Sequence, residues 1–177
     1  YPTMGNFTAQ WDLCCRISSL QDGNNDQNTR FQTIVNVGPP YNNPPVSALP
    51  NIVFMSIGQS AASFSIPGSD PDGNSITYRL STNAESTLPV ASPAGLTLSS
   101  SGVVTMNTTT RSSGQRFGIQ AMILDGMSKT PVDFIIEMVG VSAPPFYVSP
   151  TPIAPNNNIT VLPGNNVNFT IAARDND

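Results

Sequence analysis

The sequence predicts an all-β protein made of antiparallel β-sandwiches arranged in tandem. Short runs of β-branched and aromatic residues alternate with turn residues along the whole chain, which is typical of strands rather than helices. The 17 prolines and 13 glycines are spread so evenly that a helix of average length has no room. The chain also repeats itself at a spacing of roughly 105 positions, which indicates tandem domains.

The repeat is visible in two pairs of matching segments. Residues Phe64–Asp72 read FSIPGSDPD, and Phe169–Asp177 read FTIAARDND. Two proline-rich segments, 39–50 and 142–157, match at the same spacing, and their proline density predicts stiff, extended linkers. Linkers and motifs that share one offset predict a tandem repeat of about 105 residues.

This repeat divides the chain into five parts. They are the C-terminal part of a preceding β-sandwich repeat (1–38), a linker (39–50), a complete sandwich (43–141), a second linker (142–157) and the N-terminal strands of the next repeat (158–177). We expect the complete sandwich to fold alone, because about 100 residues can bury a core.

The strands follow from the alternation of apolar residues between turns. Expected strands cover 7–17, 30–37, 52–57, 62–66, 75–80, two short pieces of 93–105, 115–124 and 131–141. The loop 21–28 has turn chemistry and is interpreted as a solvated hairpin tip. The alternating positions predict a core of Phe64, Ile66, Ile76, Tyr78, Leu80, Leu96, Leu98, Val104, Phe117, Ile119, Ala121, Ile123, Phe134, Ile136 and Met138.

Composition indicates an extracellular or cell-surface protein. Only 10% of residues are charged, against roughly 25% in an average globular domain, and the net charge is -4. Such a chain has no basic face for nucleic acid or anionic lipid. No apolar run approaches the roughly 20 residues of a membrane span. Because the first residue is not an initiator methionine, we expect that a leader or a longer segment precedes it.

Four Asn-x-Thr sequons predict covalent glycans. They begin at Asn6, Asn107, Asn158 and Asn168. A surface made polar by Ser, Thr and Asn rather than by charge is common in secreted glycoproteins.

The two cysteines, Cys14 and Cys15, are adjacent. Neighbours on a strand point to opposite faces and normally pair with separate partners, so we expect disulfide partners outside this chain segment. A vicinal disulfide and two reduced thiols are the alternatives.

Three segments resemble the repeats of cadherin-like and immunoglobulin-like surface proteins. Gly68–Leu80 resembles the early Asp-x-Asp motif of cadherin repeats, and Gly95–Thr105 resembles their mid-domain segment. Ile119–Gly126 followed by Val132–Val139 is similar to their closing hairpin. The resemblance covers 43–141 and implies tandem sandwiches of this kind.

The resemblance also implies calcium at the end of the sandwich, held by Asp70, Asp72 and Asp125, since calcium needs six to eight oxygen ligands. The chain departs from the family pattern at 109–112 and in both linkers, where the family's acidic ligands are missing. The other interpretation is that these aspartates form turns by accepting backbone N–H groups.

Aromatic residues gather near the ends and linkers. Tyr41 and Phe146 hold equivalent positions in the repeat, which predicts that they fill the junction between domains. A stacking platform for sugars, also using Trp11, is the alternative.

The sequence favours a structural role without catalysis. It has no histidine for a nucleophilic relay, and its paired carboxylates lie on turns. We expect a structural module of a long extracellular glycoprotein, such as a fibre, filament, stalk or appendage, with an adhesin or carbohydrate-binding module as the alternative. Its partners would be adjacent repeats or identical subunits joined head to tail. In a head-to-tail assembly, the C-terminal strands of one copy could complete the N-terminal half-domain of the next. These two half-domains together would lack about 30 residues of one repeat, so the preferred interpretation is that this chain is part of a longer repeat protein.

Overall fold

The computed structural model describes residues 3–141, 146–147, 161–166 and 173–174. The chain forms two units, Tyr1–Gly140 and Val141–Asp177. In the second unit, β12 (Phe146–Tyr147) pairs with β13 (Ala173–Arg174). The predicted second linker and most of the segment 158–177 lie outside the described residues.

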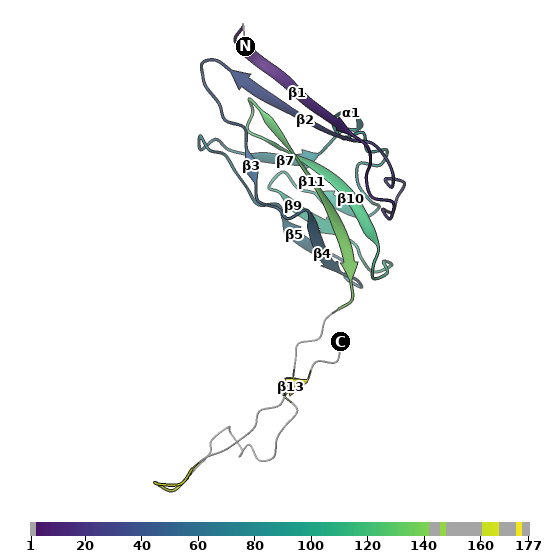
Figure 1. Cartoon of the computed structure of the whole chain (residues 1–177), viewed down its shortest axis with the longest axis vertical. Coiled ribbons are helices and arrows are strands. Elements are labelled where there is room, and N and C mark those ends of the chain that lie inside the picture. The colour runs from purple at the N-terminus through teal and green to yellow at the C-terminus, as the bar shows by residue number, and fades with distance from the viewer. Residues whose placement is uncertain (1–2, 142–145, 148–160, 167–172, 175–177) are drawn as a thin grey trace. The chain divides into compact units, whose positions relative to one another are not determined.

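The main sheet of the first unit runs in the order β1–β2–β11–β10–β7 (Figure 1). Its strands are β1 (Gly5–Leu13), β2 (Thr29–Val37), β11 (Lys129–Val139), β10 (Arg116–Leu124) and β7 (Thr77–Leu80). These neighbours are antiparallel, whereas β4 (Ile52–Ser56) runs parallel to the second half of β11. β1 is therefore an edge strand.

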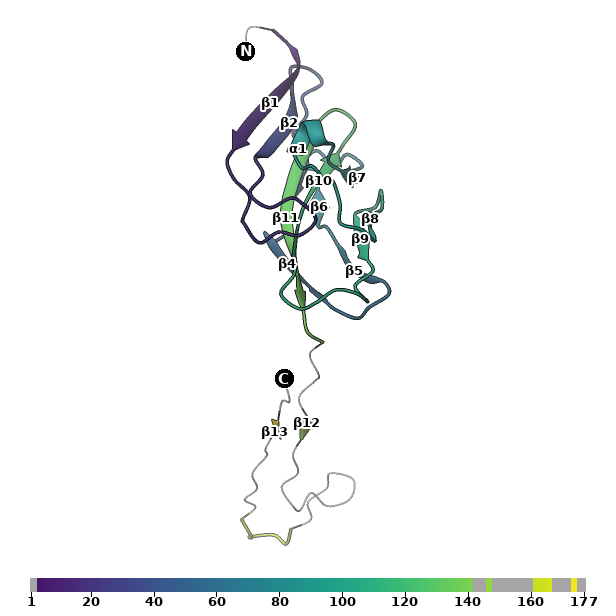
Figure 2. The same ribbon diagram turned by 90° about the vertical axis from the view of Figure 1, so that its right-hand side faces the viewer.

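A second sheet faces it, with the order β5–β9–β8. It contains β5 (Ala62–Ser65), β9 (Val103–Met106) and β8 (Leu96–Leu98), which Figure 2 shows to one side of β10 and β11. A short pair, β3 (Val46–Ser47) and β6 (Gly68–Ser69), joins the linker to the sandwich. The predicted all-β sandwich is confirmed, while the tandem repeat stays a prediction.

The core lies between the two sheets and contains the residues that alternation predicted. Phe117, Ile119 and Ile136 are at most 1% exposed, and the Phe64 and Phe134 rings meet edge to face with centroids 5.8 Å apart. Every predicted core residue belongs to this cluster or packs against it. Each fully buried side chain of this size contributes about 2 kcal/mol of hydrophobic stabilisation.

β10 is buried on its other face as well, by residues that precede β2. Leu20 is 5% exposed and Asn24 is 2% exposed, whereas most of the predicted solvated loop 21–28 is exposed. The Asn24 amide donates to the carbonyl oxygens of Val90 and Gly118. Residues 1–38 thus belong to the same compact unit as the sandwich. Their assignment to a preceding repeat stays a prediction.

One short helix, α1 (Asn83–Ser86), interrupts the strands. It begins with a capping box in which the Glu85 carboxylate accepts the Thr82 backbone N–H at 2.9 Å. No helix in the described part of the chain has the length and hydrophobicity to cross a membrane.

Candidate functional site: the clamped linker

The first proline-rich linker is bound to the end of the sandwich by a set of polar side chains. We call Asn42, Asn43, Asp72, Asp125 and Ser128 the linker clamp. Two of them come from the linker, and the others from the turns after β6 and β10. The turns bring together residues that lie more than 50 positions apart in the sequence.

Asn42 lies at the centre of the clamp and is only 7% exposed. Its Nδ2 donates to Asp125 Oδ2 at 2.8 Å and to Ser128 Oγ at 3.2 Å. Its Oδ1 accepts from Asn74 Nδ2 at 3.0 Å. A buried amide with both ends satisfied fixes the position of the linker backbone, because moving it would leave polar groups unpaired.

Asn43 and Ser47 extend the attachment along the linker. Asp72 accepts the Asn43 backbone N–H at 2.5 Å and its Nδ2 at 2.9 Å. Ser47 Oγ donates to the Pro67 carbonyl oxygen at 2.6 Å, next to the β3–β6 pairing. The linker is therefore held at successive points between 42 and 47.

Asp70 and Asp125 organise the turns that carry the clamp. Asp70 Oδ1 accepts the backbone N–H groups of Asp72 and Asn74 at 2.9 and 3.1 Å. Asp125 Oδ1 accepts those of Met127 and Ser128 at 2.7 and 2.6 Å. Burial alone would raise the pKa of Asp125, but hydrogen bonds from Asn42 and Ser128 outweigh it and lower that pKa.

The three aspartates predicted to bind calcium form hydrogen bonds within the protein. Asp70, Asp72 and Asp125 all lie at the linker end, but their oxygens mainly accept N–H and O–H donors. In the described residues, no three or more His, Cys, Asp or Glu residues group as a metal site would require. The hydrogen bonds suit the turn-forming interpretation, and calcium at these three aspartates stays a prediction.

A buried charge network joins the N-terminal hairpin to the sandwich beside α1. Glu85 is 6% exposed, and its carboxylate accepts from Lys129 Nζ at 2.5 Å and from both Nη atoms of Arg79 at 2.8 Å. Lys129 also donates to Gln32 Oε1 on β2 at 2.9 Å. The hydrogen bonds from Arg79 hold the pKa of Glu85 far below its usual range, with Lys129 and Thr82 adding to the effect against burial.

An ion pair also joins the N-terminal segment 1–38 to the sandwich. The Arg16 guanidinium binds the Asp133 carboxylate on β11 in a bidentate way, with Nη1 2.9 Å from Oδ1. Gln120, fully buried on β10, donates to Asp133 at 3.0 Å and to the Arg30 carbonyl oxygen at 2.8 Å. Sequence reasoning missed both networks, because their members come from distant strands.

Two predicted glycosylation sites lie on exposed residues. Asn107 Oδ1 accepts from the Thr109 backbone N–H at 3.0 Å and from its Oγ1 at 2.7 Å. Asn6 on β1 is exposed and accepts a hydrogen bond from Asn36 at 2.9 Å. Asn158 and Asn168 lie outside the described residues, and glycosylation of all four sequons stays a prediction.

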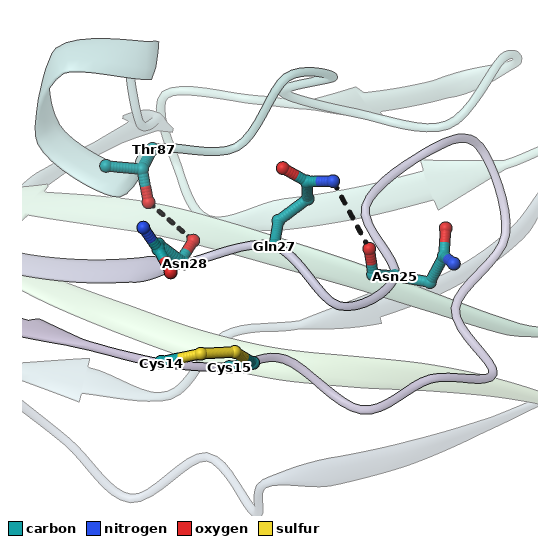
Figure 3. Close-up of a disulfide and its surroundings, with 6 residues drawn as sticks. All are labelled: Cys14, Cys15, Asn25, Gln27, Asn28 and Thr87. Carbon is teal, nitrogen blue, oxygen red and sulfur yellow. Dashed lines mark hydrogen bonds between the residues drawn. A yellow bond between two sulfur atoms is a disulfide. The ribbon is translucent and has the colours of Figure 1, made fainter.

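The structure joins Cys14 to Cys15 in a vicinal disulfide (Figure 3). This pairing is one of the alternatives that the sequence left open, and the expectation of disulfide partners outside this chain segment stays a prediction. Both residues are exposed just after β1. Nearby, Thr87 Oγ1 donates to the Asn28 carbonyl oxygen at 2.6 Å, which attaches the loop before β2 to α1.

Tyr41 does not fill a junction as predicted. Its side chain is 81% exposed, because the neighbouring Asn42 takes the buried position. The side chain of Phe146 lies outside the described part of the structure, so its place at a junction stays a prediction.

Comparison with known proteins shows distant likenesses of fold. No protein-family model matches the chain, and no curated protein matches it significantly. Among solved structures, human protocadherin-24 EC1-2 is 17% identical with a TM-score of 0.42, covering 76% of this chain and 61% of that one. A candidate alpha-galactosidase from Bacteroides fragilis is 17% identical with a TM-score of 0.41, and the match covers 53% of this chain and 17% of that one.

An endo-fucoidan hydrolase of glycoside hydrolase family 107 is 16% identical with a TM-score of 0.41, covering 84% of this chain and 22% of that one. This chain thus spans less than a quarter of either hydrolase. At these identities and TM-scores, the likenesses carry no argument about activity.

Proposed function

We propose that this chain is a stiff structural module of an extracellular glycoprotein. The observation that carries the proposal is the linker clamp, in which the proline-rich segment is bound along the sandwich. A proline-rich linker is already stiff, and hydrogen bonds from Asn42 and Asn43 fix its direction as well. The role is mechanical: the clamp sets the angle at which one part of the chain follows another.

Two contacts between residues 1–38 and the sandwich support the same proposal. They are the buried ion pair of Arg16 with Asp133 and the hydrogen bond from Lys129 to Gln32. Buried ion pairs add little net stability compared with apolar contacts, but they penalise any other arrangement of the two partners. They therefore suit a module that must keep one geometry under load.

Hydrogen exchange of the linker tests this function. In the wild-type chain, the Asn43 amide should exchange slowly because Asp72 accepts its N–H. Asp72→Ala should speed exchange across 41–47 while β10 and β11 stay protected. Gln27→Ala, at an exposed position of the 21–28 loop, is the matched control and should leave the linker unchanged. Linker amides that exchange like a free peptide in the wild type would contradict the proposal.

The exposed sequon at Asn107 supports the extracellular part of the proposal. Its Oδ1 is engaged by Thr109, and no hydrogen bond among the described residues uses Nδ2, the atom that carries an N-linked glycan. Material from its natural source should lose mass on treatment with a glycosidase. An unshifted mass for the peptides of all four sequons would count against the proposal.

A carbohydrate-binding module is the second candidate, favoured by the exposed aromatic rings of Trp11 and Tyr41, which are 67% and 81% exposed. Aromatic rings of this kind stack on sugars. A specific ligand on a glycan array would favour this function, whereas a periodic filament in electron micrographs would favour the structural one.

A further inference from the structure

Lys129 is the only lysine among the 7 lysine and arginine residues of the chain, and it is buried. Its side chain is 11% exposed, and that of its carboxylate partner Glu85 is 7% exposed. Arginine is the usual cation of a buried ion pair, because its planar guanidinium matches a carboxylate and always keeps its charge. Lysine offers what arginine lacks, a primary amine that becomes a nucleophile when it loses a proton.

A side-chain amide lies beside this amine. Lys129 Nζ donates to Gln32 Oε1 at 2.9 Å, and Gln32 is half-buried on β2. Since a C=O bond is about 1.2 Å long, the amide carbon Cδ of Gln32 lies within about 4 Å of Nζ. Reacting atoms in a near-attack geometry are about 3–3.5 Å apart, so a small rotation of either side chain brings the amine onto this carbon.

Strand pairing holds the two side chains on one face of the sheet. Lys129 lies opposite Ile34 where β11 pairs with β2, and Gln32 is two positions from Ile34 and therefore on the same face. Thr33 Oγ1 donates to the Lys129 carbonyl oxygen and fastens the two strands together. Gln32 Nε2 donates to Gln10 Oε1 at 3.3 Å in the exposed part of the hairpin, so this nitrogen has a route to water.

Glu85 supplies a proton acceptor for the amine. Its Oε1 lies 2.5 Å from Lys129 Nζ. Arg79 donates to both carboxylate oxygens at 2.8 Å and keeps the group ionised, so it is able to take a proton from the ammonium. The same hydrogen bonds make Glu85 a weak base. A reaction at this site is therefore slow, and it needs to occur only once in each molecule.

We propose that Lys129 and Gln32 join in an intramolecular isopeptide bond. The Lys129 ammonium gives a proton to Glu85, and the amine attacks Gln32 Cδ. The Nζ–Cδ bond forms and the Cδ–Nε2 bond breaks. Two protons of the original ammonium pass to Nε2, which leaves as an ammonium ion. Atoms and charge balance without an oxidant, a cofactor or a further reactant.

The inference rests on the proposed function and names the bond that carries the load. The ladder between β2 and β11 is short, so the N-terminal hairpin gains most from a covalent attachment at this point. The bond also closes the chain between 32 and 129. A pull on the two ends of the chain then passes from β2 to β11 without extending the residues between them.

The mass of the full chain, produced in a host that adds no N-linked glycans, tests the bond. After reduction of the disulfide, the wild-type chain should be lighter than its sequence by one molecule of ammonia. Trypsin does not cleave after an acylated lysine, so it should release one branched peptide that contains both Gln32 and Lys129. Lys129→Arg keeps the charge without the amine, and Gln32→Leu removes the amide carbon. Both variants should therefore have the full mass.

Two further variants separate the role of Glu85 from a general effect of substitution. Glu85→Gln removes the proton acceptor and should slow the loss of ammonia by about a hundredfold or more. Gln27→Leu replaces an exposed glutamine of the same N-terminal segment and is the control. It should lose ammonia as fast as the wild type.

Three results would overturn the proposal. The first is a wild-type chain that keeps its full mass after prolonged incubation, and the second is a Gln32→Leu chain that still loses ammonia. The third is a loss of water instead of ammonia, which would join Lys129 to Glu85.

These outcomes are separate from the test of the linker, because protection of the Asn43 amide depends on Asp72. A chain of full mass with a protected linker would refute only the isopeptide bond. An unprotected linker would refute the proposed function, whatever the mass.

Discussion

Glu85 shows how a single buried carboxylate connects three parts of the molecule. It accepts hydrogen bonds from Arg79 on β7, from Lys129 on β11 and from its own helix cap at Thr82. A carboxylate with a lowered pKa stabilises the fold at pH values above its unfolded pKa, here about 4.5, and this contribution is lost as the pH falls toward the folded pKa.

Glu85→Gln should therefore destabilise the protein at pH 7 by about 3 kcal/mol, because it leaves Lys129 buried without its charge partner. Between pH 5 and 2, the variant should also lose less stability than the wild type. Urea unfolding at several pH values measures both effects. Asp12→Asn, which breaks the exposed pair with Arg30, is the control and should leave the stability nearly unchanged because water screens that pair. Parallel pH curves for Glu85→Gln and the wild type would refute this role.

The pairing of Cys14 with Cys15 leads to a prediction about mass and stability. Under non-reducing conditions, one peptide should contain both cysteines and be lighter by two hydrogen atoms than after reduction. A bridge between neighbours closes the shortest chain loop, so Cys14→Ser with Cys15→Ser should cost only about 1 kcal/mol. A mixed disulfide with another peptide would restore the original expectation of outside partners.

At the scale of elements, alternation in the sequence predicted most strands and the inner face of β10. It could not predict that the outer face of β10 is buried too, because Gly118, Gln120 and Met122 read as an exposed side. The cover comes from Leu20 and Asn24, more than 90 positions away. The helix α1 had a signal that was overlooked, the Thr-x-x-Glu spacing of a capping box at 82–85.

Gly118 tests the contact between β10 and the N-terminal loop. A Cβ atom on this glycine would lie 2.8 Å from Leu20 Cδ1, so Gly118→Ala should push Leu20 out of its site. We expect a loss of about 1–3 kcal/mol and faster hydrogen exchange over 16–28. Gly140→Ala is the control, because a Cβ there has no heavy atom within 4 Å. Unchanged exchange in Gly118→Ala would show that the loop does not pack on β10.

At the scale of the whole molecule, the predicted repeat and the observed contacts group the residues of the first unit differently. The repeat spacing assigns 1–38 to a preceding sandwich, whereas contacts place it in one unit with the residues up to Gly140. The repeat reflects sequence alone, and it cannot reveal side-chain contacts such as Arg16–Asp133 or Gln32–Lys129. The linker clamp was equally hidden, because the polar Asn42 gave no sign that it would be buried.

Residues 43–141 should fold without the N-terminal segment but with lower stability. The core between the two sheets lies almost wholly within this range, which argues for independent folding. Removal of 1–38 would, however, uncover the outer face of β10 and leave Asp133 without Arg16. We expect cooperative urea unfolding of 43–141 with a free energy several kcal/mol below that of 1–141. A non-cooperative transition would show that the sandwich requires the hairpin, and equal stability of the two chains would show that the contacts of 1–38 add nothing to the stability of the sandwich.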